Sequence, residues 1–213
     1  MNSFTIYPSQ DYTTGEYFLK REIEGFYHSD YSSGGQWRVQ GTIENIICTL
    51  KNDITPYPND VLIKASQQLE QILLTDLPQI TNFTKNNSLT VCVVPRAKVN
   101  YSPNQLLFKN TVSRVVNQLS SYINGTSYII RHTDTKTTHR ERGGYGGNGK
   151  MPYPNITKDT CQISFEIKGK DVLLVDDLYT KTINIDEDAI QALLDKGANS
   201  VMLYVVGKTI SKY

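Results

Sequence analysis

The chain has 213 residues and a formal net charge of +1. Its length suits one domain with an elaborated loop, or one domain with a small subdomain. The balanced charge argues against the overall basic field that draws proteins to nucleic acid or acidic membranes. The N-terminus has no basic start followed by an apolar block, and no apolar run approaches the ~18 residues of a membrane span. We therefore expect a cytoplasmic protein without membrane contact, with reduced thiols at Cys48, Cys92 and Cys161.

The expected elements are poorly marked in residues 1–58 and clear after them. One helix is expected in the second half of residues 36–51. Apolar residues then recur at helical spacing in residues 59–77 and 104–123. Short apolar, β-branched runs predict strands in residues 88–95, 127–132, 161–167, 171–178 and 200–207. Nearly continuous apolar strands that alternate with helices predict the α/β class, with a parallel sheet covered by helices on both faces.

Two adjacent aspartates, Asp176 and Asp177, follow the apolar run of residues 172–175. Carboxylates at a strand end can accept hydrogen bonds from neighbouring hydroxyl groups, bind Mg²⁺ or cap a turn. Hydroxyl, ammonium and amide donors follow, just before a helix expected to begin near Ile185, where unpaired N–H groups favour a phosphate. The pattern favours a sugar phosphate. The alternative is an ordinary turn and helix start, with Asn184 as the cap and Glu187 three residues later.

Residues 171–207 resemble the phosphoribosyl-pyrophosphate signature of type I phosphoribosyltransferases, and more narrowly that of the amidophosphoribosyltransferase-like and competence-protein-F-like branch. The resemblance implies a type I phosphoribosyltransferase-like core in residues 81–213, preceded by a variable N-terminal hood and helical region in residues 1–80. It implies that the catalytic residues Asp176 and Asp177 hold the ribose hydroxyls, and that they bind Mg²⁺ weakly because the substrate supplies most of its ligands. The implied 5′-phosphate loop consists of Tyr179, Thr180, Lys181, Thr182 and Asn184.

This phosphate loop departs from the family pattern at Thr182, where the family has glycine. If that residue must adopt a positive φ, its β-branched side chain costs on the order of 1–2 kcal/mol. The acids Asp186, Glu187 and Asp188 suit the positive end of a helix dipole, but they would compete with a bound phosphate. We therefore expect a loop that differs in shape from that of the family.

Arg96 and Lys98 follow a strand that stops at Pro95. They resemble the pyrophosphate-binding loop of the family, since two cations at a strand end can neutralise a leaving diphosphate. Solvated loop charges are the alternative. Because the carboxyl ends of parallel strands meet at one edge of a sheet, we expect this stretch to lie near Asp176 and Asp177.

A long basic loop spans residues 131–160, with a Gly-rich centre. From Arg131 to Lys158 it has six Lys or Arg and two acids, a local balance of 6 − 2 = +4. It resembles the mobile loop that closes over the diphosphate in this family. A disordered polar loop and a contact with single-stranded nucleic acid are the alternatives. The candidate loop residues are Arg131, His132, Lys136, His139, Arg140 and Arg142.

The resemblance implies a phosphoribosyltransferase, a pentosyl glycosyltransferase that binds phosphoribosyl pyrophosphate with Mg²⁺. It would transfer the phosphoribosyl group to a nitrogen nucleophile and release pyrophosphate. The alternative is a non-catalytic regulatory or partner protein that senses phosphoribosyl pyrophosphate or a nucleotide. The sequence does not name the nitrogen acceptor, and it leaves the assembly open between a monomer and a homodimer.

Overall fold

The computed structural model describes residues 1–32, 34–54, 56–84, 88–141, 144 and 146–210, without the side chains of residues 139 and 141. Its centre is a six-stranded sheet with the strand order β1-β4-β10-β9-β5-β6. Strand β1 is antiparallel to β4, and the other neighbouring strands are parallel. The strands are β1 (Asn2–Ile6), β4 (Ile23–Tyr31), β5 (Leu89–Val93), β6 (Tyr122–Asn124), β9 (Asp171–Tyr179) and β10 (Ser200–Thr209). The predicted α/β class and mostly parallel sheet are confirmed.

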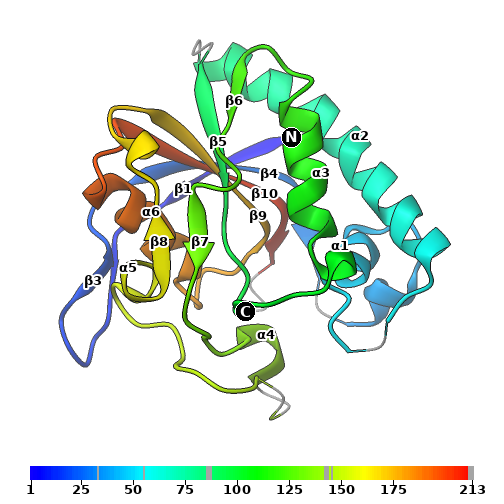
Figure 1. The fold of residues 1–213 in the computed structure, drawn as a ribbon, viewed down its shortest axis with the longest axis horizontal. Helices are drawn as coiled ribbons and strands as arrows, with labels where there is room; N and C mark the ends of the chain where they lie inside the picture. Colours follow the sequence, from blue (N-terminus) through cyan, green and yellow to red (C-terminus); the bar gives the residue numbers. More distant parts are fainter. Residues whose placement is uncertain (33, 55, 85–87, 142–143, 145, 211–213) are drawn as a thin grey trace.

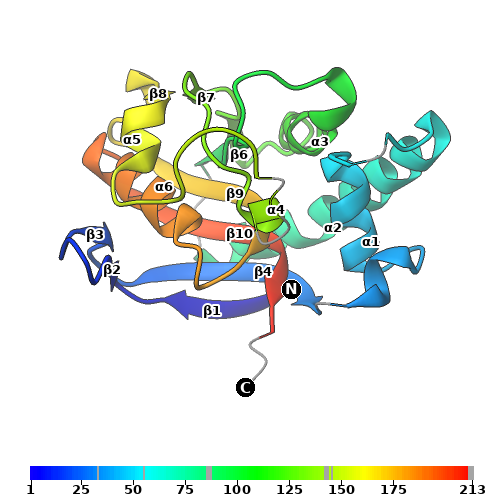
Figure 2. The same ribbon diagram turned by 90° about the horizontal axis from the view of Figure 1, so that it is seen from below.

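Helices cover both faces of this sheet (Figures 1 and 2). One face packs against α1 (Ile43–Lys51), α2 (Asn59–Thr84) and α3 (Leu107–Val116), and the other against α6 (Ile185–Asp195). The short helix α5 (Ile156–Thr160) contacts α6. On α2 the side chains of Leu69, Leu73 and Leu77 are fully buried at a spacing of four residues. This one-sided burial is the physical source of the periodicity that predicted the helix.

Three predicted elements differ in extent or partner. The helix expected in residues 104–123 ends at Val116, and the apolar residues that follow enter β6. Residues 127–132 and 161–167 do contain strands, β7 (Ile129–Arg131) and β8 (Cys161–Ile163), but these pair antiparallel with each other in a separate ribbon. Their inward side chains pack on the α6 side of the central sheet. The apolar pattern therefore correctly indicates that these strands are buried, but it does not show which sheet they join.

The N-terminal region supplies part of the central sheet. Strand β4 pairs in parallel with β10, and β1 forms the edge beyond it. Ile23 and Phe26 are buried on opposite faces of the sheet. Residues 1–80 and 81–213 therefore both contribute strands to the same sheet. A short hairpin of β2 (Ser9–Gln10) and β3 (Tyr17–Leu19) completes this region.

The thiols of Cys48, Cys92 and Cys161 are free, and the last two are buried. Among the described residues, the longest helices are too polar or too short to cross a bilayer.

Candidate functional site

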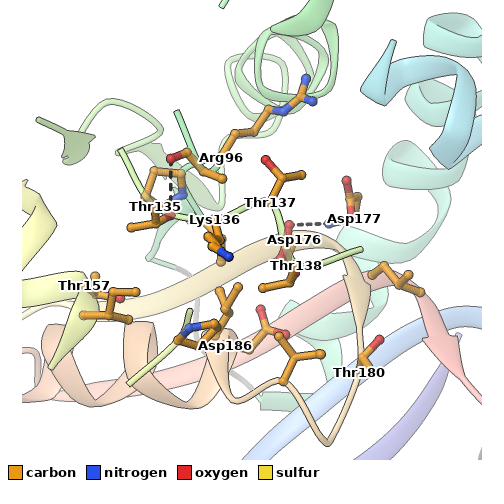
Figure 3. A pocket seen from close by; sticks show the side chains of 18 of the residues that line it. Arg96, Thr135, Lys136, Thr137, Thr138, Thr157, Asp176, Asp177, Thr180 and Asp186 are labelled. Atoms are coloured by element: carbon orange, nitrogen blue, oxygen red, sulfur yellow. Dashed lines mark hydrogen bonds between the residues drawn. The ribbon is translucent and has the colours of Figure 1, made fainter. Parts of the chain in front are cut away.

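Three stretches that are distant in the sequence line one cavity of about 420 Å³ (Figure 3). The loop after β5 contributes Pro95, Arg96 and Ala97. The long basic loop contributes residues 135–138, and the end of β9 contributes Asp176 and Asp177 together with the loop that follows. The prediction that the stretch after β5 lies near Asp176 and Asp177 is confirmed, because β5 and β9 are parallel neighbours whose carboxyl ends lie side by side.

Asp176 and Asp177 lie within β9, which continues to Tyr179 beyond the predicted strand end. The backbone N–H of Asp177 donates to the carboxylate of Asp176 at 2.7 Å. The Asp177 carboxylate forms an ion pair with Lys51, whose Nζ lies 3.0 Å away, and both side chains are about one fifth exposed, at 19% and 20%. The two carboxylates therefore lie at the cavity wall with different partners.

Lys51 is a site residue that sequence reasoning missed. It is the last residue of α1, a helix from the N-terminal region that packs over the sheet. Burial alone would lower the pKa of the Lys51 ammonium, but the charges of Asp177 and Asp176 outweigh it and raise that pKa. No local pattern marks Lys51, because its role depends on where α1 ends relative to β9.

Replacing Lys51 with methionine is expected to lower the free energy of unfolding at pH 8 by about 1–2 kcal/mol. The loss should be smaller than the ~3–5 kcal/mol of a fully buried pair, because this pair is partly exposed. Urea unfolding measures it, with Lys64→Met on the exposed face of α2 as the matched control. The double variant Lys51→Met/Asp177→Asn should recover part of the loss. A stability equal to that of the wild type would show that Lys51 does not compensate these carboxylates.

The first turn of α6 carries three buried acids, Asp186, Glu187 and Asp188, which are 4%, 2% and 2% exposed. Burial raises the pKa of each carboxyl group. They are therefore not the solvated first-turn acids of an ordinary helix start.

Each acid has its own partner. Asp188 accepts hydrogen bonds from the backbone N–H groups of Asn155 and Thr157, at 2.6 and 2.7 Å. Glu187 accepts one from the hydroxyl of Tyr179 at 2.7 Å, so the capping box that the sequence suggested with Asn184 does not form. Asp188 and Glu187 thus connect α6 to the long loop and to β9.

Asp186 lines the cavity, and its carboxyl group lies close enough to that of Asp176 for each to shift the pKa of the other. Burial, followed by the charge of Asp177, raises the pKa of Asp176 to about 7. Burial, followed by the charge of Asp176, raises the pKa of Asp186 well above its usual range. One proton held between these two carboxyl groups relieves their repulsion. The second oxygen of Asp186, Oδ1, is buried and has no hydrogen-bond partner.

The predicted phosphate loop is only partly directed at the cavity. Thr180 and Thr182 line it. Tyr179 is buried against Glu187, Lys181 is exposed, and Asn184 begins α6 with a φ of 61°. The left-handed residue of this loop is therefore Asn184, not Thr182. Asparagine tolerates this conformation better than a β-branched residue, so the strain considered for Thr182 does not arise here.

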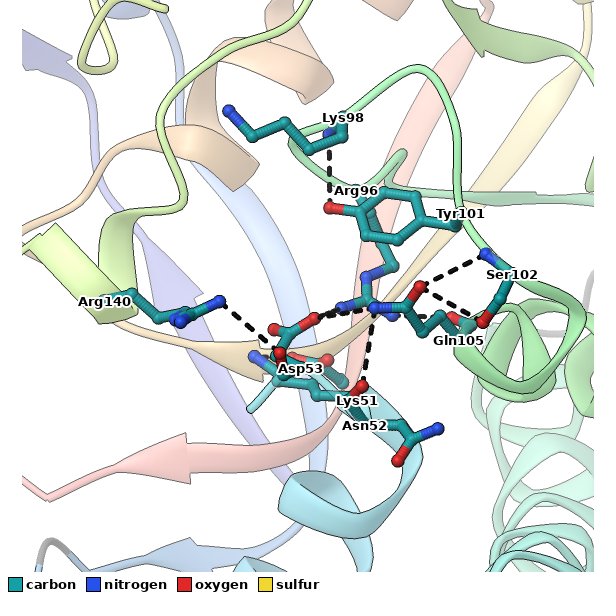
Figure 4. Close-up of polar contacts among 10 residues, drawn as sticks. Lys51, Asn52, Asp53, Arg96, Lys98, Tyr101, Ser102, Gln105 and Arg140 are labelled. Carbon is teal, nitrogen blue, oxygen red and sulfur yellow. Dashed lines mark hydrogen bonds and ion pairs between the residues drawn. The ribbon is translucent and has the colours of Figure 1, made fainter. Parts of the chain in front are cut away.

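Arg96 and Lys98 both have protein partners in this structure (Figure 4). The Arg96 guanidinium pairs with Asp53 and stacks over Tyr101, 4.1 Å from the ring centre. It points away from Asp176 and Asp177 (Figure 3). The Lys98 ammonium donates to two carbonyl groups of the basic loop, those of Thr135 at 2.7 Å and Asn148 at 2.6 Å. Arg96 thus connects this stretch to the end of α1, and Lys98 connects it to the basic loop.

The basic loop is hydrogen-bonded to the stretch after β5. Arg131 donates to the carbonyl of Arg96 at 2.5 Å and to the hydroxyl of Thr160 at 2.6 Å. Thr135 donates its N–H to Ala97 at 2.8 Å. These contacts place the side chain of Lys136 in the cavity (Figure 3).

The remaining loop candidates are less closely associated with the cavity. The ring of His132 is exposed and hydrogen-bonds the Thr133 hydroxyl at 2.9 Å. Arg140, in the short helix α4 (Thr138–Glu141), donates to the carbonyl of Asp53 at 3.5 Å (Figure 4). The side chain of His139 and the whole of Arg142 lie outside the described residues.

Replacing Gly149 with alanine is expected to lower the free energy of unfolding by about 1–3 kcal/mol. Gly149 has a φ of +110°, and an added Cβ would lie 2.6 Å from the carbonyl oxygen of Asp134. Gly144→Ala is the matched control, because its φ is +76° but nothing lies within 4 Å of its added Cβ. Urea unfolding compares the two. Equal losses would show that only backbone strain matters and that the loop is not packed at Gly149.

A magnesium ion would need most of its ligands from a bound molecule. In the part of the chain that the structure describes, no group of three or more His, Cys, Asp or Glu side chains could hold a metal ion. Asp177 is paired with Lys51, and Asp176 interacts with the neighbouring carboxyl group of Asp186. Mg²⁺ requires near-octahedral oxygen coordination, so these residues do not fit a site made by the protein alone.

Comparisons with known proteins do not identify the family of the chain. No family model matches the chain, and no curated protein matches it significantly. Among solved structures it is similar to the crystal structure of a hypoxanthine-guanine phosphoribosyl transferase from L. donovani, with 12% sequence identity and a TM-score of 0.34. The match covers 68% of this chain and 70% of that chain. A likeness of this degree carries no argument about activity.

Proposed function

We propose that the cavity binds phosphoribosyl pyrophosphate and that the protein transfers its phosphoribosyl group to a nitrogen nucleophile. The observation that carries this proposal is the meeting of Asp176 and Asp177 with the hydroxyl groups of Thr180 and Thr182 in one cavity. Carboxylates accept hydrogen bonds from ribose hydroxyls, and hydroxyl donors beside a helix start suit a phosphate. The Lys136 ammonium in the same cavity suits the diphosphate.

In this reaction the nitrogen forms a bond to C1 of the ribose as the bond from C1 to the diphosphate oxygen breaks. The diphosphate leaves with the electron pair, and the nitrogen loses its proton to solvent. The residues of the chain supply position and charge rather than a covalent nucleophile. Asp176 and Asp177 would orient the ribose, and the threonine hydroxyls would hold the 5′-phosphate. Lys136 would stabilise the negative charge that develops on the diphosphate.

A pyrophosphate-release assay with Mg²⁺ and a panel of nitrogen acceptors tests the proposed transfer. The expected result is release that depends on one class of acceptor. Calorimetric titration of phosphoribosyl pyrophosphate into the wild type, with ribose 5-phosphate as the reference ligand, tests binding separately. Absence of binding in this titration would contradict both the enzyme and the sensor.

A non-catalytic sensor of phosphoribosyl pyrophosphate is the second candidate. It is favoured by the ion pair of Arg96 with Asp53, which keeps the guanidinium away from the cavity's acids. Binding without pyrophosphate release for any acceptor would identify the sensor.

A further inference from the structure

A second cavity of about 240 Å³ adjoins the first. The two share Lys51, Arg96, Asp176 and Asp177, so a ligand in the second cavity would lie beside the carboxylates of the first. Its size suits a compound smaller than most ligands of protein pockets, which typically occupy ~300–1,000 Å³.

The walls of the second cavity are mainly apolar. The side chains come from the end of α1, from β5 and the loop after it, from the start of α3 and from β7. Such walls favour a flat or compact apolar body over a strongly hydrated one. The apolar and aromatic lining residues are Leu50, Val93, Val94, Val99, Tyr101, Leu106, Phe108, Ile129 and Ile130.

The cations around this cavity have protein partners, with one exception among the described residues. Lys51 pairs with Asp177, and Arg96 pairs with Asp53. Lys98 and Arg131 donate to backbone carbonyl groups. A diphosphate would need several of these cations at once, so their pairing argues against that ligand here.

Lys109, in the first turn of α3, is the exception. It lines the cavity, is partly buried, and makes no hydrogen bond or ion pair with any described residue. Burial lowers the pKa of its ammonium. A partly desolvated ammonium at an apolar wall is stabilised by a single anionic group.

We propose that the second cavity binds the nitrogen acceptor, and that this acceptor is a ring-sized apolar amine or nitrogen heterocycle with one carboxylate, paired with Lys109. This inference rests on the proposed transfer, because it places the acceptor nitrogen beside Asp176 and Asp177. The apolar walls hold the ring, and Lys109 sets the specificity for the carboxylate.

The probe is 2-aminobenzoate, whose fluorescence reports its binding without phosphoribosyl pyrophosphate, with aniline as the analogue that lacks the carboxylate. In the wild type, the dissociation constant of 2-aminobenzoate is expected to be at least about tenfold lower than that of aniline. The affinity of aniline is measured by its competition with fluorescent 2-aminobenzoate. Lys109→Met keeps the chain length and removes the charge, and should abolish that preference. Lys64→Met, on an exposed face of α2, should leave it unchanged. Leu106→Trp should fill the cavity and weaken both ligands.

A wild type that does not prefer 2-aminobenzoate, or a Lys109→Met variant that keeps the preference, would overturn the inference. The separate calorimetric titration with phosphoribosyl pyrophosphate distinguishes the two proposals. If 2-aminobenzoate binds as expected but phosphoribosyl pyrophosphate does not, the acceptor role falls together with the proposed function. If phosphoribosyl pyrophosphate binds and 2-aminobenzoate does not, the proposed function stands and this inference fails.

Discussion

Replacing Asp176 and Asp177 together with asparagine is expected to weaken the binding of phosphoribosyl pyrophosphate by about 100-fold or more. Each carboxylate would accept hydrogen bonds from ribose hydroxyl groups, and a hydrogen bond to a charged group contributes roughly 1.5–3 kcal/mol. Asparagine keeps the shape of aspartate but removes the charge and one acceptor oxygen. Calorimetric titration of phosphoribosyl pyrophosphate in the presence of Mg²⁺ measures its affinity for the wild type and for the double variant.

Asp195→Asn is the matched control, because Asp195 is exposed at the end of α6 and lies outside both cavities. Circular dichroism establishes that both variants are folded. An unchanged affinity in the double variant would remove Asp176 and Asp177 from the proposed binding site. If the folded wild type itself does not bind, the scaffold serves as an interaction surface and not as a sugar-phosphate site.

Replacing Asp186 with asparagine is expected to raise the free energy of unfolding at pH 8 by about 2–4 kcal/mol. Asp186 is buried and Asp176 is partly buried beside it, and one of them must lose its proton against the charge of the other as the pH rises. An amide at position 186 removes this repulsion and can donate to the Asp176 carboxylate. The cost that disappears is that of ionising Asp186 itself, because burial and then the charge of Asp176 raise its pKa well above the usual range, and each pKa unit corresponds to ~1.4 kcal/mol.

The raised pKa values of Asp176 and Asp186 determine how the free energy of unfolding changes with pH. The folded protein keeps protons on Asp176 and Asp186 at pH values where the unfolded chain has lost them. These two groups therefore make the free energy of unfolding fall as the pH rises from about 4 to about 7. In Asp186→Asn this decrease should become smaller, because only the contribution of Asp176 remains, whose pKa is raised by burial and by the charge of Asp177; the exposed control Asp30→Asn should keep the full decrease. Urea unfolding at pH 5 and pH 8 measures it, and a wild-type stability that does not fall would contradict the buried carboxyl pair.

Asp186 also shows a conflict between stability and a proposed role. A buried carboxyl oxygen without a partner costs free energy, yet it faces the cavity in which we place the substrate. Natural proteins retain such unfavourable groups mainly at functional sites. The affinity of the Asp186→Asn variant for phosphoribosyl pyrophosphate should therefore be measured together with its stability.

The sequence by itself determined the elements whose pattern is local. One buried face per helix marks α2, and apolar runs mark β5, β9 and β10, because these patterns follow from helix and strand geometry alone. It also determined that the loops after β5 and β9 meet, since the carboxyl ends of parallel strands gather at one edge of a sheet.

Only the tertiary structure decided which charges meet. Lys51 reaches Asp177 because α1 ends above β9, and Arg96 pairs with Asp53 for the same reason. The burial of Asp186 depends on how α6 packs against β9, so the sequence alone was compatible with a solvated helix start there. The sequence gives the charged residues and their order along the chain. Long-range packing sets the distances between these charges and their exposure to water, and those two quantities control the electrostatic energies.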